Sequence, residues 1–148
     1  MKQNAEIQYS IRLKDIFFPK VVLSAGDELK KDVASEISVR LQYEIDPNPS
    51  DKRVYQVMFT IKVEDEKTKF DLEVESVAYF ECSNDIDDAF MNSGFIKVNS
   101  PAIAFPFVRS FINTLTTNAG FYPVILPAFN FTRSKPVEDE SPDNPIMQ

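Results

Sequence analysis

The chain has 148 residues, of which 43% are hydrophobic, and a formal net charge of −7. This length and composition predict one domain with a substantial core, and the acidic balance disfavours nucleic acid as a partner because phosphates repel an acidic surface. No histidine is present. Since histidine is the commonest general base and metal ligand, we predict a protein that is not an enzyme and uses no metal or cofactor.

The first expected strand covers residues 6–18. Ile11 and Leu13 alternate with charged residues, as in a strand with one wet face. The alternation breaks at residues 15–18, which indicates a bulge or burial on both faces, and Pro19 is expected to end the strand. No stretch of the chain has the apolar length of a signal peptide or a membrane span, so we expect a soluble, cytoplasmic protein without membrane insertion.

Three more strands are expected, over residues 33–45, 55–63 and 69–82. Their apolar and polar side chains alternate, and a sheet with one wet face is typically antiparallel. The outward side of the last strand carries Asp71, Glu73 and Glu75, which form either a solvated face or a docking surface. The strand ends at Cys82, the only cysteine. Because Cys82 has no histidine to activate it, we expect an inert, partly buried thiol in a reducing compartment.

A short helix is expected next, over residues 83–93. Asn84 or Asp85 provides its N-cap, and Gly94 ends it. Its apolar side is formed by Ile86, Ala89, Phe90 and Met91.

A long helix is expected over residues 101–118. Ser100 is a good N-cap, Pro106 either kinks the helix or starts a second one, and Gly120 provides a left-handed stop. An apolar face is formed by Phe107, Val108, Phe111, Ile112 and Leu115. The opposite side carries small polar residues that either face solvent or permit close contact with another helix: Ser110, Asn113, Thr114 and Thr117.

The segment 121–131 is apolar and aromatic, whereas connections are usually polar. Pro123 and Pro127 keep it extended. The segment is therefore either a strap that pins the helix to the core or a binding surface.

Residues 132–148 are rich in proline and acidic side chains, which predicts a disordered tail after a domain of residues 1–131. Four strands followed by a long helix predict an α+β fold with a four-stranded antiparallel sheet. A single helix leaves the core of such a sheet thin.

Three linked motifs lie in the last third of the chain: residues 104–109 (Ala-Phe-Pro-Phe-Val-Arg), 118–123 (Asn-Ala-Gly-Phe-Tyr-Pro) and 126–131 (Leu-Pro-Ala-Phe-Asn-Phe). In this order and spacing they resemble the SecB family of protein-export chaperones, and residues 14–18 add a weaker match. The resemblance implies an ATP-independent holdase that binds unfolded polypeptides through apolar grooves and passes preproteins to the SecA translocase motor. It also implies a homotetramer built as a dimer of dimers.

The resemblance also implies three sets of site residues. Client contact is expected at Val33, Met91, Phe95, Phe121, Tyr122, Val124 and Leu126. Docking of the motor is expected on an acidic outer sheet face at Asp15, Asp71 and Glu73, although Asp71 stands where the family usually has an apolar residue. The oligomer interface is expected at Ser110, Asn113, Thr114 and Thr117.

The chain departs from the family pattern after Phe131, where a second helix is usual and a proline-rich acidic tail follows instead. That helix borders the client groove in the family, so its absence bears on both the groove and the export role. Three alternatives stay open: a chaperone for another client such as an antitoxin, a carrier of small apolar ligands, and a subunit with one fixed partner.

Overall fold

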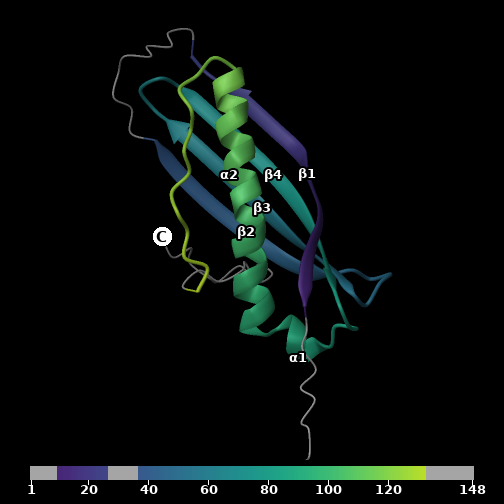
Figure 1. The fold of residues 1–148 in the computed structure, drawn as a ribbon. Coiled ribbons are helices and arrows are strands. Elements are labelled where there is room, and N and C mark those ends of the chain that lie inside the picture. Colours follow the sequence, from purple (N-terminus) through teal and green to yellow (C-terminus); the bar gives the residue numbers. More distant parts are fainter. Residues whose placement is uncertain (1–9, 27–36, 133–148) are drawn as a thin grey trace, which may run out of the picture.

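A computed structural model describes residues 10–26 and 37–132 of the protein. Four strands precede three helical elements: β1 (Ile11–Ser24), β2 (Ser38–Pro47), β3 (Val54–Asp65), β4 (Phe70–Cys82), α1 (Asp88–Met91), the π-helical turn η1 (Phe95–Asn99) and α2 (Ser100–Asn118). The predicted α+β layout, an antiparallel sheet followed by a long helix, is confirmed (Figure 1).

The strands form one antiparallel sheet in the order β1–β4–β3–β2, with β3 and β4 in the centre. α2 lies across one face of this sheet (Figure 1). The side chains that the central strands turn toward α2 are almost inaccessible to solvent: Tyr55, Val57, Phe59, Ile61, Val63, Phe70, Leu72, Val74, Ala78 and Phe80. This alternation confirms the predicted inner face and forms the core.

β1 is an edge strand and continues through Pro19 to Ser24, so the prediction that the proline ends it is wrong. Its pairing with β4 shifts register twice, after Leu13 and after Phe17. The two shifts flank residues 15–17 of the segment 15–18, for which a bulge or burial on both faces was predicted. The second falls at Pro19, whose missing N–H donor is tolerated at an edge strand or a bulge.

β2 is the opposite edge strand and is placed from Ser38 onward. Val33, the predicted start, lies outside the described residues. Tyr43 is buried and its ring packs against Phe131 of the segment after α2. Three other inward side chains are only half-buried: Val39, Leu41 and Ile45. The predicted alternation of this strand is confirmed, with incomplete burial because an edge strand has a neighbour on one side only.

α1 is shorter than predicted and has a different cap. Asp87 is the N-cap, and its Oδ1 accepts the Phe90 N–H at 2.7 Å. Asp85, a predicted cap, instead accepts from the Arg53 guanidinium at 3.2 Å. Gly94 has a φ of −60° and leads into η1, so it is not the predicted stop. From Gly94 the chain continues through η1 into α2 in helical conformation, so no helix ends at Gly94.

Ser100 is a helical residue of α2, and its predicted role as N-cap is wrong. Its backbone N–H bonds to the Ile96 carbonyl of the preceding turn. Its hydroxyl is buried and lies 2.6 Å from the hydroxyl of Tyr55 on β3. Burial raises the pKa of Tyr55 to about 12, and the hydrogen bond with Ser100 opposes this shift. The pair ties the start of α2 to the sheet.

α2 continues through Pro106, and no second helix starts there. Its core side is formed by Ala104, Phe105, Val108, Ile112 and Thr116, while Phe111 and Leu115 are half-buried. Phe107, predicted on the same face, is 52% exposed. The buried residues recur at helical spacing around Val108 and Ile112, and this spacing turns Phe107 toward the outside.

Gly120 ends α2 in a left-handed conformation with a φ of 90°, as predicted. The Gly120 N–H bonds to the Thr117 carbonyl at 3.1 Å, and the Phe121 N–H bonds to the Thr116 carbonyl at 3.0 Å. These two bonds form a Schellman motif. The chain then returns alongside α2 in an extended path (Figure 1).

Candidate functional site

The extended residues 121–131, here called the return segment, have one buried side and one exposed side. Val124, Leu126 and Phe131 are buried, whereas Tyr122 and Ile125 are 60% and 62% exposed. The two interpretations of the sequence therefore apply to different side chains of one segment. Half of the segment pins α2 to the core, and the other half presents apolar side chains to solvent.

Specific contacts hold the return segment in place. The Val124 N–H donates to Thr116 Oγ1 at 2.9 Å, and that hydroxyl donates to the Ile112 carbonyl at 2.8 Å. At one end, the ring of Phe121 lies edge-on to Phe70 with centroids 5.3 Å apart. At the other end, Phe131 packs edge-on against Tyr43, Phe59 and Phe105. Because both ends and the middle are fixed, the exposed side chains have a rigid support.

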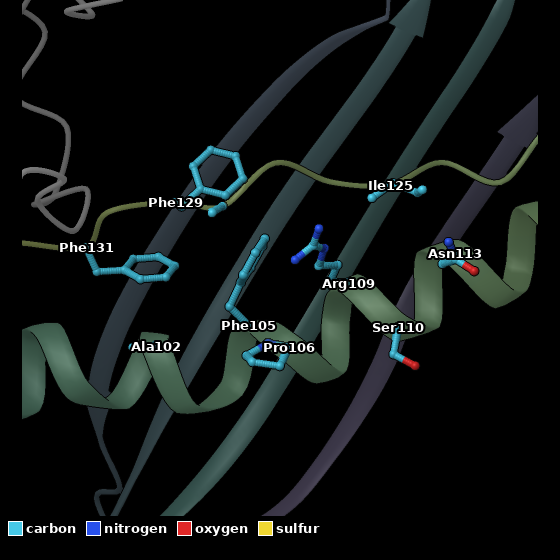
Figure 2. A pocket seen from close by; sticks show the side chains of 10 residues that line it. Ala102, Phe105, Pro106, Arg109, Ser110, Asn113, Ile125, Phe129 and Phe131 are labelled. Atoms are coloured by element: carbon cyan, nitrogen blue, oxygen red, sulfur yellow. The ribbon is translucent and has the colours of Figure 1, made fainter.

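A groove of about 420 Å³ lies between α2 and the return segment (Figure 2). It is lined by Ala102, Phe105, Pro106, Arg109, Ser110, Asn113, Ile125, Ala128, Phe129 and Phe131. Pro106 has no N–H, so the carbonyl of Ala102 lacks its helical donor on this wall. Most of the lining side chains are apolar, and a few polar groups lie along the helix. This is the usual composition of a binding site.

Among the described residues that line the groove, Arg109 is the one with a charged side chain. It makes no ion pair with any residue that the structure describes. Figure 2 shows its guanidinium in the space between α2 and the return segment. The described lining residues include no carboxylate, lysine or cysteine, so they are suited to binding and offer no pair of groups for acid–base or nucleophilic chemistry.

The predicted client-binding residues are dispersed. Tyr122 and Phe95 are exposed, Met91 and Phe121 are half-buried, and Val33 lies outside the described residues. Val124 and Leu126 are buried in the single chain and face the sheet side. None of the six described residues of this set lines the groove. The sequence analysis missed Ile125 and Phe129 as groove residues. The apolar composition of residues 121–131 marked the segment but did not indicate which of its side chains face the groove.

The predicted interface residues lie on the outer side of α2. Ser110, Thr114 and Thr117 are exposed, and Asn113 lies at the edge of the groove. Ile103 and Phe107 are also exposed, at 39% and 52%. Together these residues form an outer ridge with spacings of four, three, four and three residues: Ile103, Phe107, Ser110, Thr114 and Thr117. Such spacing is that of a helix seam that packs against another helix.

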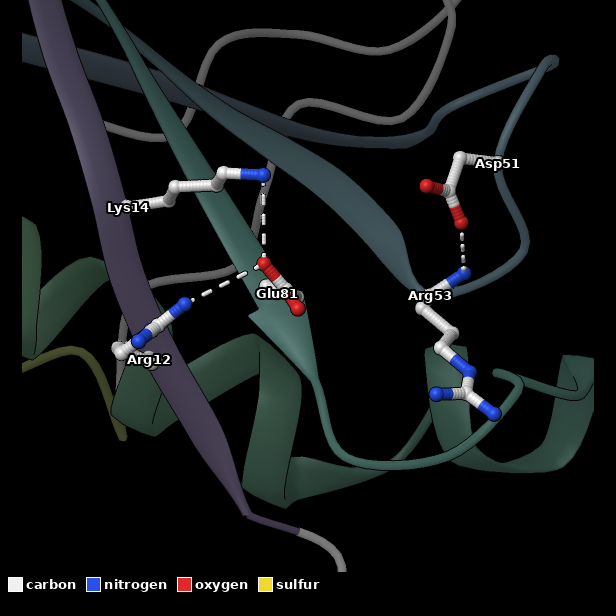
Figure 3. Close-up of polar contacts among 5 residues, drawn as sticks. All are labelled: Arg12, Lys14, Asp51, Arg53 and Glu81. Atoms are coloured by element: carbon white, nitrogen blue, oxygen red, sulfur yellow. Dashed lines mark hydrogen bonds and ion pairs between the residues drawn. The ribbon is translucent and has the colours of Figure 1, made fainter.

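The predicted docking carboxylates lie on the sheet face that points away from α2. Asp15 pairs with Tyr79, six residues along β4 from Glu73, which corresponds to about 20 Å. Glu73 is bonded to Lys20 at 3.2 Å. Farther along the same strand, Arg12 and Lys14 both contact Glu81 (Figure 3). Basic residues therefore interrupt the carboxylates, and the structure does not gather Asp15 with Asp71 and Glu73 into one cluster.

Comparison with known sequences identifies the relatives of this chain. A family model described as SecB, preprotein translocase subunit SecB, matches residues 2–134. The chain is 31% identical over 131 residues to the protein-export protein SecB of Rickettsia typhi, with 86% of this chain and 80% of the relative covered. It is 33% identical over 105 residues to an uncharacterized protein of Methanocaldococcus jannaschii, and the match covers 68% of this chain and 66% of that protein, just under two thirds.

Among solved structures, the chain is similar to the Mycobacterium tuberculosis SecB-like chaperone Rv1957, determined in complex with a ChAD peptide from the HigA1 antitoxin. The TM-score is 0.63 at 14% identity, and the match covers 86% of this chain and 93% of the other. At this identity the likeness shows the fold. Within the part of the chain that the structure describes, no helix has the length and apolarity needed to cross a bilayer.

One long helix across a four-stranded antiparallel sheet, followed by an apolar return segment, defines a SecB-like α+β protein. The chain belongs to the SecB family. Proteins of this family are chaperones and not enzymes, which agrees with the predicted lack of catalysis.

Proposed function

We propose that this protein is an ATP-independent holdase that binds unfolded polypeptides, including preproteins, in the cytoplasm and keeps them competent for export. The observation that carries the proposal is the mainly apolar groove, with the exposed Ile125 in its lining and Tyr122 exposed on the same segment. Large exposed apolar patches are avoided in globular proteins unless they bind something.

The physical basis is the burial of client side chains. Removal of apolar surface from water contributes about 25 cal/mol per Å². Pro123 and Pro127 stiffen the return segment, so little conformational entropy is lost when a client binds. Because the chaperone binds the unfolded state and not the native one, mass action alone opposes folding and aggregation, and no ATP is required.

The proposed assembly is a tetramer in which the outer ridges of α2 pack against one another. The exposed Ile103 and Phe107 support this packing because the ridge otherwise leaves two large apolar side chains in water. Small residues at Ser110, Thr114 and Thr117 permit close approach of two helices. In light scattering at micromolar concentration, Thr114→Arg is expected to yield dimers from a tetrameric wild type, because like charges meet across the ridge. A monomeric wild type, or an unchanged mass of the variant, contradicts this assembly.

Delivery to the SecA motor is proposed to use the outer sheet face. We expect Asp15→Lys combined with Glu73→Lys to weaken binding of the motor at least tenfold while client holding persists. Binding of the wild type should also weaken with salt, because exposed charges are screened beyond about 8 Å at physiological ionic strength. Motor binding that is indifferent to both changes would exclude this surface.

The central experiment measures aggregation of a chemically denatured protein diluted into buffer with and without this chaperone, in the absence of ATP. We expect suppression at near-stoichiometric chaperone and release of a client that can still fold. One-to-one binding of a fluorescent fatty acid without suppression would favour a carrier of small apolar ligands. Co-purification from the host then separates a range of preproteins from a single antitoxin or another fixed partner.

A further inference from the structure

Arg109 brings a positive charge into the groove between α2 and the return segment. Its guanidinium lies in the space between these two elements (Figure 2). It has no ion pair with any described residue. A guanidinium beside apolar walls is less screened than one in open water, and its planar fork favours two-point contact with a carboxylate. The groove is therefore suited to a carboxylate that can reach Arg109.

The chain itself has carboxylates shortly after one end of this groove. Phe131 lines the groove, and its ring centroid lies 5.8 Å from that of Phe105. The described part of the chain ends one residue later, at Thr132. Residues 137–140, here called the acidic segment, lie outside the described residues and have the sequence Val-Glu-Asp-Glu. The acidic segment is thus tethered beside the groove.

The tether is long enough for the acidic segment to reach Arg109. The helix wall of the groove runs from Ala102 to Asn113, which corresponds to about 16 Å. The chain from Thr132 to Glu138 extends up to about 20 Å. Residues 133–136 are enough for a hairpin turn, which commonly takes about two to five residues, and the proline at position 136 is a typical turn residue. A tether this short keeps the acidic segment concentrated at the groove.

The return segment has a backbone edge along which the acidic segment can lie. It is extended but belongs to no strand, and the backbone groups of Ile125, Ala128 and Phe129 make no hydrogen bond to other described residues. A second extended backbone pairs with such free donors and acceptors. Because alternate residues of an extended chain face the same way, Glu138 and Glu140 would face Arg109 together.

We propose that the acidic segment folds back into the groove, pairs with Arg109 through Glu138 or Glu140, and competes with clients. The contact is autoinhibitory: a client displaces it only when burial of its apolar side chains outweighs one ion pair. Weakly apolar polypeptides are then excluded from the groove, and strongly apolar ones are held. This regulation rests on the proposed holdase function and acts on the same site.

The test uses the full chain and a neutral, fluorescently labelled peptide with the central sequence Leu-Gln-Phe-Gln-Leu. In fluorescence anisotropy at low salt, Glu138→Gln combined with Glu140→Gln is expected to bind this peptide about tenfold more tightly than the wild type, because one charge-assisted competing contact is lost. Added salt is expected to narrow this difference by screening the ion pair in the wild type.

A charge-matched control separates this contact from an effect of net charge. Glu44→Gln combined with Glu66→Gln also removes two negative charges. Both side chains are exposed and have no ion pair among the described residues. This variant is expected to bind the peptide as the wild type does.

Amide hydrogen exchange tests the contact without any client. Residues 125–129 are expected to exchange faster in Glu138→Gln combined with Glu140→Gln than in the wild type, and also faster in Arg109→Gln. The triple variant is expected to exchange no faster than either, because both changes break the same contact. Arg109→Lys keeps the charge without the fork and is expected to retain part of the protection.

Several outcomes overturn the proposal. Equal peptide binding and equal exchange in the wild type and the Glu138→Gln, Glu140→Gln variant refute autoinhibition, and the holdase function stands if aggregation is still suppressed. Weaker peptide binding by that variant would show that the acidic segment helps to hold clients. Faster exchange of the wild type on dilution would assign the groove to the acidic segment of a second copy. If neither protein binds the peptide or suppresses aggregation, the holdase function fails, and the exchange measurement still decides the contact.

Discussion

The layer formed by α2 and the return segment has two sides, which differ in how closely their side chains are packed and how far they are exposed to solvent. The sheet-facing side has close-packed side chains and buried hydrogen bonds, among them Tyr55–Ser100 and Val124–Thr116. The outward side has large apolar side chains that are more than half exposed: Phe107, Tyr122 and Ile125. The same eleven-residue segment contributes to both. The buried residues of this extended segment, Val124 and Leu126, thus anchor the exposed side chains of Tyr122 and Ile125.

The comparison predicts its largest effect for Leu126, which is fully buried. Leu126→Ala is expected to lower the free energy of unfolding by about 2–5 kcal/mol, because the cavity forms in a close-packed core. Its neighbour Ile125 is the matched control, and Ile125→Ala is expected to cost under about 1 kcal/mol because the side chain is exposed. Urea denaturation of both variants measures the difference. Similar losses would show that the two sides of the segment are not distinct.

The Tyr55–Ser100 contact predicts a pH-dependent effect on the sheet-facing side. The pKa of Tyr55 is raised from 10.0 to about 12 in the folded protein, first by burial. The unfolded chain therefore releases this proton before the folded chain does, and stability present below pH 10 is lost as pH rises toward 12. One pKa unit corresponds to about 1.4 kcal/mol, so Tyr55 lowers the stability of the wild type by roughly that amount at pH 11.

Tyr55→Phe removes this titration, and its stability is expected to fall less between pH 8 and pH 11 than that of the wild type. At pH 8 the variant is less stable by about 1 kcal/mol, since one buried hydrogen bond is lost. Tyr43, whose pKa burial also raises, is present in both proteins and cancels. Urea denaturation at the two pH values makes the comparison. Parallel pH dependence in the two proteins would show that Tyr55 is not held protonated by the fold.

The smallest effect on stability is expected on the outward side. Tyr122→Ser combined with Ile125→Ser should change the free energy of unfolding by under about 1 kcal/mol. The same variant is expected to need several times more chaperone for equal suppression of aggregation, because its client contacts are removed. Val22→Ser removes an exposed apolar group from β1, outside this layer, and is expected to hold clients normally. Full activity of the double variant would place client binding elsewhere.

The regular elements were predictable because each depends on a local period. Two-residue alternation located the four strands, and the left-handed stop at Gly120 ended the long helix where expected. The predictions were wrong where a tertiary contact outweighed the local preference of a residue. Pro19 is accommodated because β1 is an edge strand. Ser100 cannot act as an N-cap because its backbone N–H bonds to the carbonyl of Ile96 in η1 and its hydroxyl shares a buried hydrogen bond with the hydroxyl of Tyr55.

The candidate site was only partly predictable. The apolar character of residues 121–131 and the small polar residues of α2 could be recognised in the sequence. Which side of the segment faces the core depends on its register against α2, and the Val124–Thr116 hydrogen bond fixes that register. Ile125 and Phe129 therefore could not be assigned to the groove from composition.

The sequence by itself determined the strand order along the chain, the extent and end of the long helix, and the family through the motifs from Ala104 to Phe131. Only the tertiary structure decided that Val124 and Leu126 are buried, that Phe107 is exposed, and that Arg109 stands alone in an apolar groove. The physical reason is that backbone periodicity is local and is encoded residue by residue. The environment of a side chain is set by whatever distant segment packs against it.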